Sequence, residues 1–343
     1  MSNTATVLAF DFGASSGRAI RAVYDGQNLN YEEIHRFENI PIEKDGHLCW
    51  DVETLLKEIH TAIQKAGTFD SLGFDTWGVD FGLLDTDGHL LANPVHYRDV
   101  RTNGKLEQAA ARMPAEELYA HTGNQIMVIN TLFQLLALRE QDPELLQKAE
   151  QILFMPDLFA ALLGAEPVCE RSIASTSQML DPRTGQWSRE VLAAYGLNAN
   201  RFAPLVASGT VTGTLANGAK IIAVAGHDTQ CASATMPCAE EDAEHTAFLS
   251  CGTWSLLGTE LEAPILTADS CQSGLSNELG ANGKINYLKN IIGLWLIQES
   301  RREYKRRGQA YSFAELEQQA LAAEPLRSFI DPDAPEFVAP GDL

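Results

Sequence analysis

The sequence contains six cysteines but no C-x-x-C pair, so it offers neither the spacing of a zinc site nor a disulfide framework. No apolar run approaches the length that spans a bilayer. Asp11 interrupts the only apolar stretch near the N-terminus, which argues against a secretory signal. We therefore expect a reduced cytoplasmic protein whose thiols, including that of Cys251, are buried.

Positive charge is also scarce. The 343 residues carry 25 lysines and arginines against 46 aspartates and glutamates, a formal net charge of −21. A field of this sign repels phosphate, so we expect neither nucleic acid nor an anionic membrane as a partner. A protein this acidic that handles phosphate needs metal ions and clusters of backbone N–H groups. The chain is long enough for two domains, and its 45% hydrophobic residues are ordinary for a globular protein.

The stretch AFDFGASSGRAIRAVYDG, residues 9–26, is open to three interpretations. Residues 13–17 fit G-x-S-x-G, the elbow of a serine hydrolase, with Ser15 as the nucleophile. Residues 11–13 spell the magnesium-binding DFG triplet of protein kinases. The third interpretation is a glycine turn between two strands, with backbone N–H groups that hold phosphate and with Asp11 holding Mg²⁺ directly or through water.

The residues after Gly17 decide between the three. Residues 18–24 are rich in strand formers and end at the Asp25-Gly26 turn, which predicts an antiparallel meander. A hydrolase elbow and a P-loop both need a helix directly after the motif, and the kinase triplet needs a domain upstream of Asp11. The phosphate turn remains, beside the simpler alternative of an ordinary hairpin turn that uses Gly and Ser for its own geometry.

Further elements follow from periodicity and caps. A helix is predicted from the Asp51 cap to Gly67, and another over residues 312–323, where Ser312 and Glu315 form a capping box. Residues 71–84 are predicted to form a strand, an interruption at Trp77-Gly78 and a second strand. The other expectations are helices from about 105 to 164, short strands and turns over 165–218, a buried strand over 221–226, and a helix over 290–307.

Residues 250–255, SCGTWS, resemble residues 11–16: a glycine and a closing serine stand between two apolar runs. The match predicts two α/β domains that each open with a glycine-turned hairpin. Two such turns on opposite walls of a cleft supply the donors that clamp a triphosphate.

Several positions have both a functional and a structural interpretation. Asp228 follows the buried strand, where it can serve as general base for a substrate hydroxyl or as the cap of a helix beginning at Thr229. Trp77-Gly78 offers an indole face and a close backbone approach to a sugar, or a core tryptophan beside a bulge. Substrate contact or a salt-bridge cluster are the two possibilities for the polar loop with Arg98, Asp99 and Arg101.

Seven segments occur in the order and spacing of one family. The sequence resembles the FGGY carbohydrate kinases, and within them the kinases of rhamnulose, in FDFGASSGR, GFDTWGVDFGLLD, YRDVRTNG, MPDLF, GHDT, LSCGTWSLLG and LKNIIGLWLIQ. The resemblance runs from residue 7 to the end of the chain. It implies an α/β, actin-like (ribonuclease H-like) fold of two domains with the active site in the cleft between them.

The resemblance also implies a reaction: the γ-phosphate of ATP is transferred to O1 of L-rhamnulose, with Mg²⁺, giving L-rhamnulose 1-phosphate and ADP in rhamnose catabolism. By position, Asp228 matches the proton acceptor. The residues that match ATP contacts of the family are Ala14, Ser15, Ser16, Gly17, Arg18, Thr253 and Gln298. The residues that match its sugar contacts are Gly78, His227, Asp228, Thr229 and Asn290.

The sequence departs from the family at its end. It stops with PGDL at residues 340–343, where the family continues with a glycine-rich adenosine-binding segment and closing helices. We therefore expect a first domain, residues 1–238, with the sugar site, the first phosphate turn and Asp228, and a partial second domain, residues 239–343. The alternatives are a kinase of another ketose or deoxysugar and a catalytically inactive sugar-binding fragment.

Overall fold

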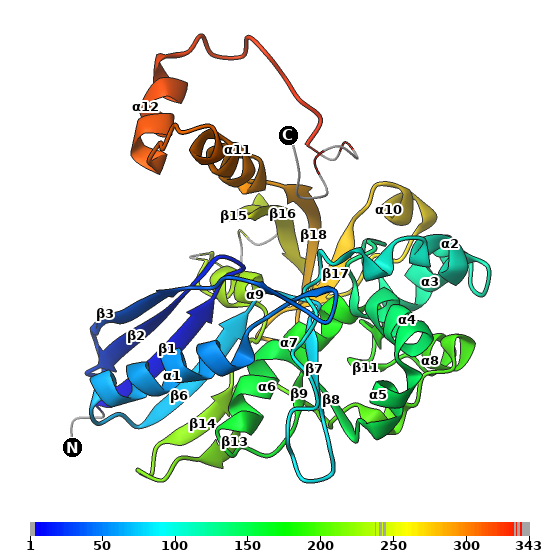
Figure 1. Cartoon of the computed structure of the whole chain (residues 1–343), viewed down its shortest axis with the longest axis horizontal. Helices are drawn as coiled ribbons and strands as arrows, with labels where there is room; N and C mark the ends of the chain where they lie inside the picture. The colour runs from blue at the N-terminus through cyan, green and yellow to red at the C-terminus, as the bar shows by residue number, and fades with distance from the viewer. Residues whose placement is uncertain are drawn as a thin grey trace.

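The structure, a computed structural model, describes residues 4–236, 238–239, 242, 245–332, 334 and 337. In this part of the chain two larger sheets form from successive stretches of the sequence, with helices packed around them (Figure 1). Residues 340–343, at which the sequence departs from the family, lie outside the described residues. No helix of the described residues is both long and apolar enough to span a bilayer.

The first sheet has six strands in the order β13-β14-β6-β1-β2-β3. The meander predicted after the glycine turn is confirmed, because β1 pairs antiparallel with β2, and β2 with β3. β6 pairs in parallel with β1 and with β14, so the carboxyl ends of these three strands meet beside the turn that follows β1. The strands are β1 (Ala5–Phe12), β2 (Ser16–Tyr24), β3 (Leu29–Glu38), β6 (Ser71–Thr76), β13 (Thr210–Thr214) and β14 (Lys220–Ala223).

Aromatic rings fill the core beneath this sheet. Phe10 and Phe12 are fully buried on β1, and the ring centres of Phe10 and Phe74 lie 4.8 Å apart. Helix α1 (Val52–Ala66) adds Leu55 and Ile59 to the same cluster. Burial of side chains of this size is the main stabilising contribution, at about 1.5–3 kcal/mol for each.

The predicted helix ends are confirmed. The side chain of Asp51 accepts a hydrogen bond from the N–H of Thr54, and Gly67 closes α1 with φ 66°. At the other end of the chain, helix α12 (Phe313–Ala322) begins with the complete capping box of Ser312 and Glu315. These ends were predictable because each depends on residues within one helical turn.

Helices dominate residues 105–164 as predicted, but strand β8 (Gln151–Phe154) interrupts them and pairs antiparallel with β7 (Phe81–Leu84). Residues 165–218 contain the predicted short strands but also helices α7 and α8, which were not predicted. The helices of this region are α2 (Lys105–Ala110), α3 (Ala115–Thr122), α4 (Thr131–Gln141), α5 (Pro143–Lys148), α6 (Met155–Leu162), α7 (Arg171–Ala174) and α8 (Arg189–Tyr195). The small two-stranded sheets add β4 (Ile42–Lys44), β5 (His47–Cys49), β9 (Cys169–Glu170), β10 (Leu180–Asp181), β11 (Gln186–Trp187) and β12 (Leu205–Val206).

The second sheet has the order β15-β16-β18-β17, and all neighbours are antiparallel. The glycine-turned hairpin predicted around residues 250–255 is confirmed, because β15 and β16 pair antiparallel on either side of that turn. The helix predicted over 290–307 is wrong at its start: residues 290–292 belong to β18, whose eight residues all pair with β16, and α11 begins at Trp295. The elements are β15 (Phe248–Cys251), β16 (Trp254–Leu261), β17 (Ser276–Leu279), β18 (Ile285–Ile292), α10 (Ala268–Gln272) and α11 (Trp295–Arg306).

The strands also test two predictions from the sequence, the serine hydrolase elbow and the burial of the cysteine thiols. Because residues 16–24 form a strand and not a helix, the hydrolase elbow is excluded. Gly17 lies within β2, where an added Cβ would be 2.3 Å from a ring atom of Phe37, so the site has no room for a side chain. The expectation of buried thiols is confirmed for Cys49 and Cys169 but wrong for the others: Cys231, Cys238 and Cys271 are half-buried, and Cys251 lies on β15, an edge strand, and is exposed.

Candidate active site

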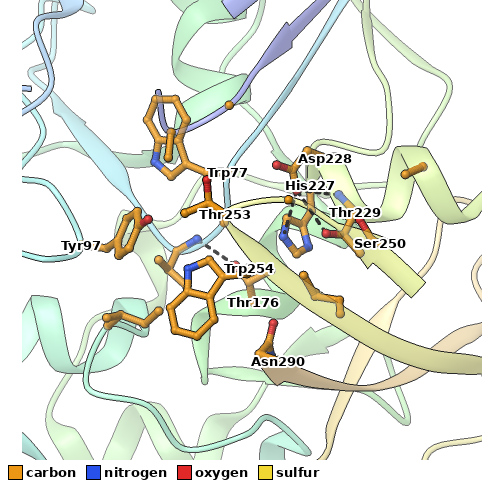
Figure 2. Close-up of a pocket in the computed structure, with 18 of the residues that line it drawn as sticks. Trp77, Tyr97, Thr176, His227, Asp228, Thr229, Ser250, Thr253, Trp254 and Asn290 are labelled. Atoms are coloured by element: carbon orange, nitrogen blue, oxygen red, sulfur yellow. Dashed lines mark hydrogen bonds and ion pairs between the residues drawn. The ribbon is translucent and has the colours of Figure 1, made fainter. Parts of the chain in front are cut away.

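A cavity of about 590 Å³ is lined by residues of both sheets (Figure 2). Its walls come from the β1–β2 turn, the segment after β6, the start of α9 (Asp228–Ser233), the β15–β16 turn and the start of α11. The predicted site residues that line it are Asp11, Ala14, Ser15, Arg18, Gly78, His227, Asp228, Thr229, Thr253, Asn290 and Gln298. Ser16 and Gly17, the first two residues of strand β2, do not line it, whereas the next residue of that strand, Arg18, does.

The first turn is braced from inside the protein. The N–H of Gly13 donates to the carbonyl of Ser16 at 2.9 Å. The buried Asn39 donates through Nδ2 to the carbonyl of Gly13 at 2.9 Å and through its backbone N–H to that of Ser15 at 3.1 Å. Within the described part of the chain, the backbone N–H groups of Ala14 and Ser15 have no protein acceptor. They are therefore available to an anion in the cavity.

The second turn forms one unit with the helix that follows it. The N–H of Gly252 donates to the carbonyl of Trp254 at 2.9 Å, and the N–H of Trp295 donates to the carbonyl of Thr253 at 3.2 Å. The hydroxyl of Thr253 lies 3.4 Å from the side-chain oxygen of Gln298, on α11. The two glycine turns are about 240 residues apart in the sequence, yet both line the same cavity.

Three carboxylates meet at the cavity. Asp11 and Asp75 are partners in the β1–β6 register, and Asp228 follows the end of β14. Burial raises the pKa of Asp75 well above its ordinary value, and the negative charges of Asp11 and then Asp228 raise it further. Arg18 pairs with Asp11 at 2.6 Å but leaves an excess of negative charge on hard oxygen ligands. The three carboxylates do not gather closely enough to hold one ion by themselves, but Asp11 alone offers the hard oxygen ligand with which Mg²⁺ binds, because Mg²⁺ keeps several waters and binds through one or two carboxylates.

Asp228 is both the first residue of α9 and part of the cavity wall. Its Oδ1 accepts from the N–H of Thr229 at 2.6 Å and lies 3.5 Å from Nε2 of His227. The position of Asp228 deep in the cavity raises its pKa, and the charge of His227 offsets part of that shift. Its side chain remains 39% exposed. The carboxylate therefore bonds the helix start, as a cap does, and stays accessible from the cavity.

Aromatic side chains lie on one side of the cavity, where Figure 2 shows Trp77, Tyr97 and Trp254. Trp77 is only 6% exposed, so it belongs to the core and lines the cavity as well. The neighbouring Gly78 faces His227, and a Cβ added to Gly78 would lie 3.4 Å from Nε2 of that histidine. The absence of a side chain at Gly78 keeps this part of the cavity open.

The buried Asp80 fixes the aromatic side. Its carboxylate accepts from the indole N–H groups of Trp50 at 2.6 Å and Trp77 at 3.0 Å, and from the backbone N–H of Tyr97 at 3.2 Å. The residue before it, Val79, has φ 66°, a strained conformation for a β-branched residue. The surrounding hydrogen bonds hold the strained segment in place at the cavity.

We expect Asp80 to make the stability of the protein depend on pH. Burial raises its pKa from 3.8 to about 6, although the hydrogen bonds from Trp50, Gln134 and Trp77 act to lower it. Since the folded state then holds the proton more tightly than the unfolded state, stability falls as the pH rises through 6. Between pH 5 and 7.5, the wild type should lose about 1–2 kcal/mol of unfolding free energy relative to Asp80→Asn. Urea unfolding of both proteins measures this, and a pH-independent difference would contradict it.

The loop with Arg98, Asp99 and Arg101 does not line the cavity. The guanidinium of Arg98 lies 3.9 Å from the ring centre of Trp295, on α11. Asp99 accepts from the backbone N–H of Arg101 at 2.9 Å and pairs with His47 at 3.0 Å. The loop thus packs its own part of the chain against the second sheet and its helix through Arg98, while Asp99 forms an ion pair with His47.

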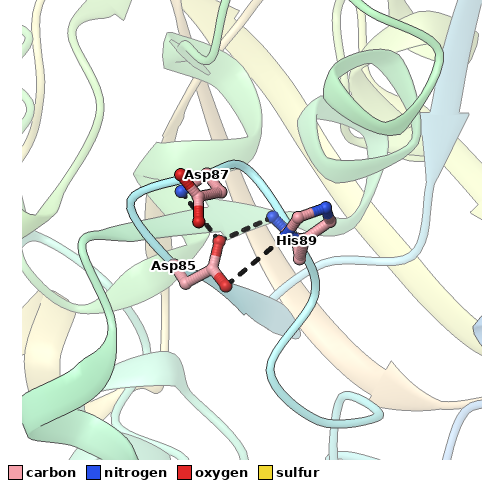
Figure 3. A group of neighbouring side chains, drawn as sticks. All are labelled: Asp85, Asp87 and His89. Atoms are coloured by element: carbon pink, nitrogen blue, oxygen red, sulfur yellow. Dashed lines mark hydrogen bonds and ion pairs between the residues drawn. The ribbon is translucent and has the colours of Figure 1, made fainter.

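One group of possible metal ligands in the described residues, Asp85, Asp87 and His89, lies in the turn after β7 (Figure 3). Oδ1 of Asp85 accepts from the backbone N–H groups of Asp87 at 2.9 Å and His89 at 2.8 Å. The carboxylate therefore closes the turn. None of the three residues lines the cavity.

Three acidic residues at or beside the cavity, Asp75, Asp80 and Glu278, were not predicted from the sequence. Asp75 and Asp80 stand in GFDTWGVDF, and an acidic residue inside such an apolar run is costly unless it has partners, which was a usable signal. Glu278 stands in SNEL, on β17, with no comparable signal. Its place in the cavity depends on how β17 packs against the first half of the chain.

Comparison with known families gives matches over nearly the whole chain. Residues 6–234 match the N-terminal domain of the FGGY family of carbohydrate kinases, and residues 247–343 match its C-terminal domain. A rhamnulokinase of Bacteroides thetaiotaomicron is 40% identical over an alignment that covers 98% of this chain and 70% of that protein. A rhamnulokinase of Halalkalibacterium halodurans is 38% identical over an alignment that covers 98% of this chain and 73% of that protein.

Solved structures of sugar kinases are similar in fold. The ligand-bound xylulose kinase of Lactobacillus acidophilus has a TM-score of 0.73 at 15% identity, covering 93% of this chain and 66% of that one. The gluconate kinase of the same organism has a TM-score of 0.71 at 15% identity, covering 87% and 62%. The predicted α/β, actin-like fold is confirmed, and this chain spans about two thirds of the length of these two kinases.

Proposed function

Since this chain belongs to the FGGY family of carbohydrate kinases, we propose that it transfers the γ-phosphate of ATP to O1 of L-rhamnulose, giving L-rhamnulose 1-phosphate and ADP. The observation that carries the proposal is one cavity lined by two glycine turns and by Asp228. The 40% identity to a rhamnulokinase supports rhamnulose as the ketose and rhamnose catabolism as the setting.

The sugar binds between the aromatic side and α9. Gly78 leaves space for it, and His227, Thr229 and Asn290 line that space with polar groups. The accessible carboxylate of Asp228 accepts the proton of the sugar hydroxyl as its oxygen attacks the γ-phosphorus. The raised pKa of Asp228 favours proton uptake, while the charge of the nearby His227 acts in the opposite direction and favours the carboxylate form.

The nucleotide phosphates bind between the two turns. The backbone N–H groups of Ala14 and Ser15 face them from the first turn, with Ser16, Gly17 and Arg18 continuing that loop into β2. From the other wall, Thr253 and Gln298 complete the clamp. Asp11 would hold Mg²⁺, which would supply positive charge that offsets the negative charge of the phosphates.

The two domains contribute different residues to the site. Residues 1–238 form a first domain with the sugar site, the first turn and Asp228, and residues 239–343 contribute to a second domain with Thr253, Asn290 and Gln298. Transfer between ATP and sugar takes place in the cleft between the two domains, which excludes water from the phosphate.

An ADP-release assay over a panel of ketoses, with L-rhamnulose, other ketoses and no sugar, tests the proposal. We expect release of ADP that depends on Mg²⁺ and is fastest with L-rhamnulose. Preference for another ketose would overturn the substrate. Sugar binding detected by calorimetry, with no ADP formed from ATP in the presence of any ketose, would support a sugar-binding protein in place of a kinase.

We expect Gly78→Ala to weaken sugar binding. The added methyl would lie 3.4 Å from Nε2 of His227 and 3.3 Å from Cγ2 of Thr176, in space that the sugar needs. The KM for L-rhamnulose should rise about tenfold, equivalent to about 1.4 kcal/mol, with the KM for ATP nearly unchanged. Steady-state kinetics against both substrates measure it.

The control for this variant is Gly88→Ala. Gly88 lies in the exposed turn after β7, with nothing within 4 Å of an added Cβ but with φ +80°. This change should lower stability without altering either KM. An equal rise in both KM values for Gly78→Ala would count against a sugar contact at Gly78.

A further inference from the structure

A buried chain of side chains leads from the second sheet to Asp228. Oε2 of Glu278, on β17, lies 3.0 Å from Nδ1 of His227, and Nε2 of the same ring lies 3.5 Å from Oδ1 of Asp228. His227 is 8% exposed and Glu278 4% exposed. Figure 2 shows the histidine ring beside Asp228. The imidazole is therefore held between two carboxylates that come from different parts of the chain.

Glu278 is itself held in place. Nε2 of the fully buried Gln230, on α9, donates to Oε2 of Glu278 at 2.8 Å, and the amide of Asn286, on β18, donates to the side-chain oxygen of Gln230. The next residue along β17, Leu279, donates its N–H to the hydroxyl of Ser175 at 3.0 Å. The carboxylate thus has little freedom to leave His227.

The charges around His227 favour its protonated form. Burial acts to lower the pKa of His227, but the carboxylates of Glu278 and then Asp228 outweigh burial, and the pKa is raised. The acidic groups that face the ring are Glu278 from β17, Asp228 from α9 and Glu170 from β9. Removal of Glu278 takes away the closest of the three.

We propose that Glu278 is a positioning residue of this kinase, which binds Nδ1–H of His227 and thereby directs Nε2 toward Asp228. The inference rests on the proposed function, because it assigns Glu278 to the proton acceptor of that reaction. Glu278 fixes both the direction and the charge of the ring, and the ring in turn holds the Asp228 carboxylate ready for the sugar hydroxyl. The base is then correctly placed only while β17 lies against the first half of the chain.

Glu278→Gln tests this proposal, since the glutamine oxygen still accepts from Nδ1–H but carries no charge. We expect kcat to fall about tenfold or more, with the KM for L-rhamnulose changed less than about threefold. In ¹⁵N NMR spectra, the imidazole pKa of His227 should fall by about 1 or more. Glu278→Asp keeps the charge, so its His227 pKa should stay above that of Glu278→Gln.

The matched control is Glu260→Gln, on β16 of the same sheet, where Glu260 pairs with Lys284 at 3.1 Å. This variant should change neither kcat nor the titration of His227. Loss of activity in Glu278→Gln with an unchanged His227 titration would overturn the proposal, as would an unchanged kcat. If Glu278→Gln does not fold, Glu278→Asp decides by the same two readouts. A different pair of results would refute the proposed function instead. In that case the wild type phosphorylates no ketose, although the His227 pKa still falls in Glu278→Gln.

Discussion

Asp228→Asn should reduce kcat by about 10³-fold or more while the Kd for L-rhamnulose stays within about threefold. The asparagine retains the shape of the side chain and an oxygen for the N–H of Thr229, which Asp228 now binds at 2.6 Å. It cannot take up the proton of the sugar hydroxyl, because an amide is not basic at neutral pH. ADP release measures turnover, and calorimetry measures sugar binding separately.

A matched control for the loss of one acidic group is Asp269→Asn, in the exposed first turn of α10. It should leave kcat unchanged. Turnover of Asp228→Asn near that of the wild type would remove Asp228 from the role of proton acceptor. Loss of sugar binding together with turnover would show instead that the change disturbs the sugar site as a whole.

Asp11→Asn should lower kcat about 100-fold or more at saturating ATP, and should raise the Mg²⁺ concentration needed for half-maximal rate. Asp11 is the acidic residue of β1 that lines the cavity, opposite Asp75 in the β1–β6 register. Neutralising it removes a ligand that hard cations prefer. Rates measured across a Mg²⁺ titration, with EDTA as the zero point, give both quantities.

The same change also breaks the ion pair with Arg18, so a second variant separates the two effects. Arg18→Gln breaks the pair but keeps the carboxylate of Asp11, and it should raise the KM for ATP without shifting the Mg²⁺ dependence. An unshifted Mg²⁺ dependence in Asp11→Asn would contradict the metal role of Asp11. Glu32→Gln, on the exposed outer strand β3, is the control for loss of charge alone.

The features that the sequence predicted well are those set by neighbours in the chain. The β1–β2 turn and the strand after it follow from the strand formers and the Asp25-Gly26 turn. The cap at Asp51 and the capping box at Ser312 depend on side chains within one helical turn. The family resemblance added expected roles for Gly78 and Asp228, positions at which local pattern alone left a functional and a structural interpretation open, and these roles stay predictions.

The features that it missed are set by distant partners. Residues 151–154 become strand β8 because they pair with β7, and residues 290–292 extend β18 because β16 lies beside them. Asp75 reaches the cavity only through its register with Asp11. Glu278 reaches His227 only through packing between the two sheets, a contact that spans 51 residues of sequence. Periodicity within one segment carries no information about such contacts.

The guanidinium of Arg98 stacks on Trp295, 3.9 Å from its ring centre, and lies 5.4 Å from the ring centre of Trp254. We expect this contact to affect the tryptophan fluorescence of the protein. A cation over an indole changes the surroundings of the chromophore, and this contact joins a loop of the first half to the helix that follows the second turn. Movement of that helix away from the loop would part the guanidinium from both rings. Tryptophan emission in a stopped-flow instrument would then follow such movement as nucleotide and sugar arrive, with no attached dye.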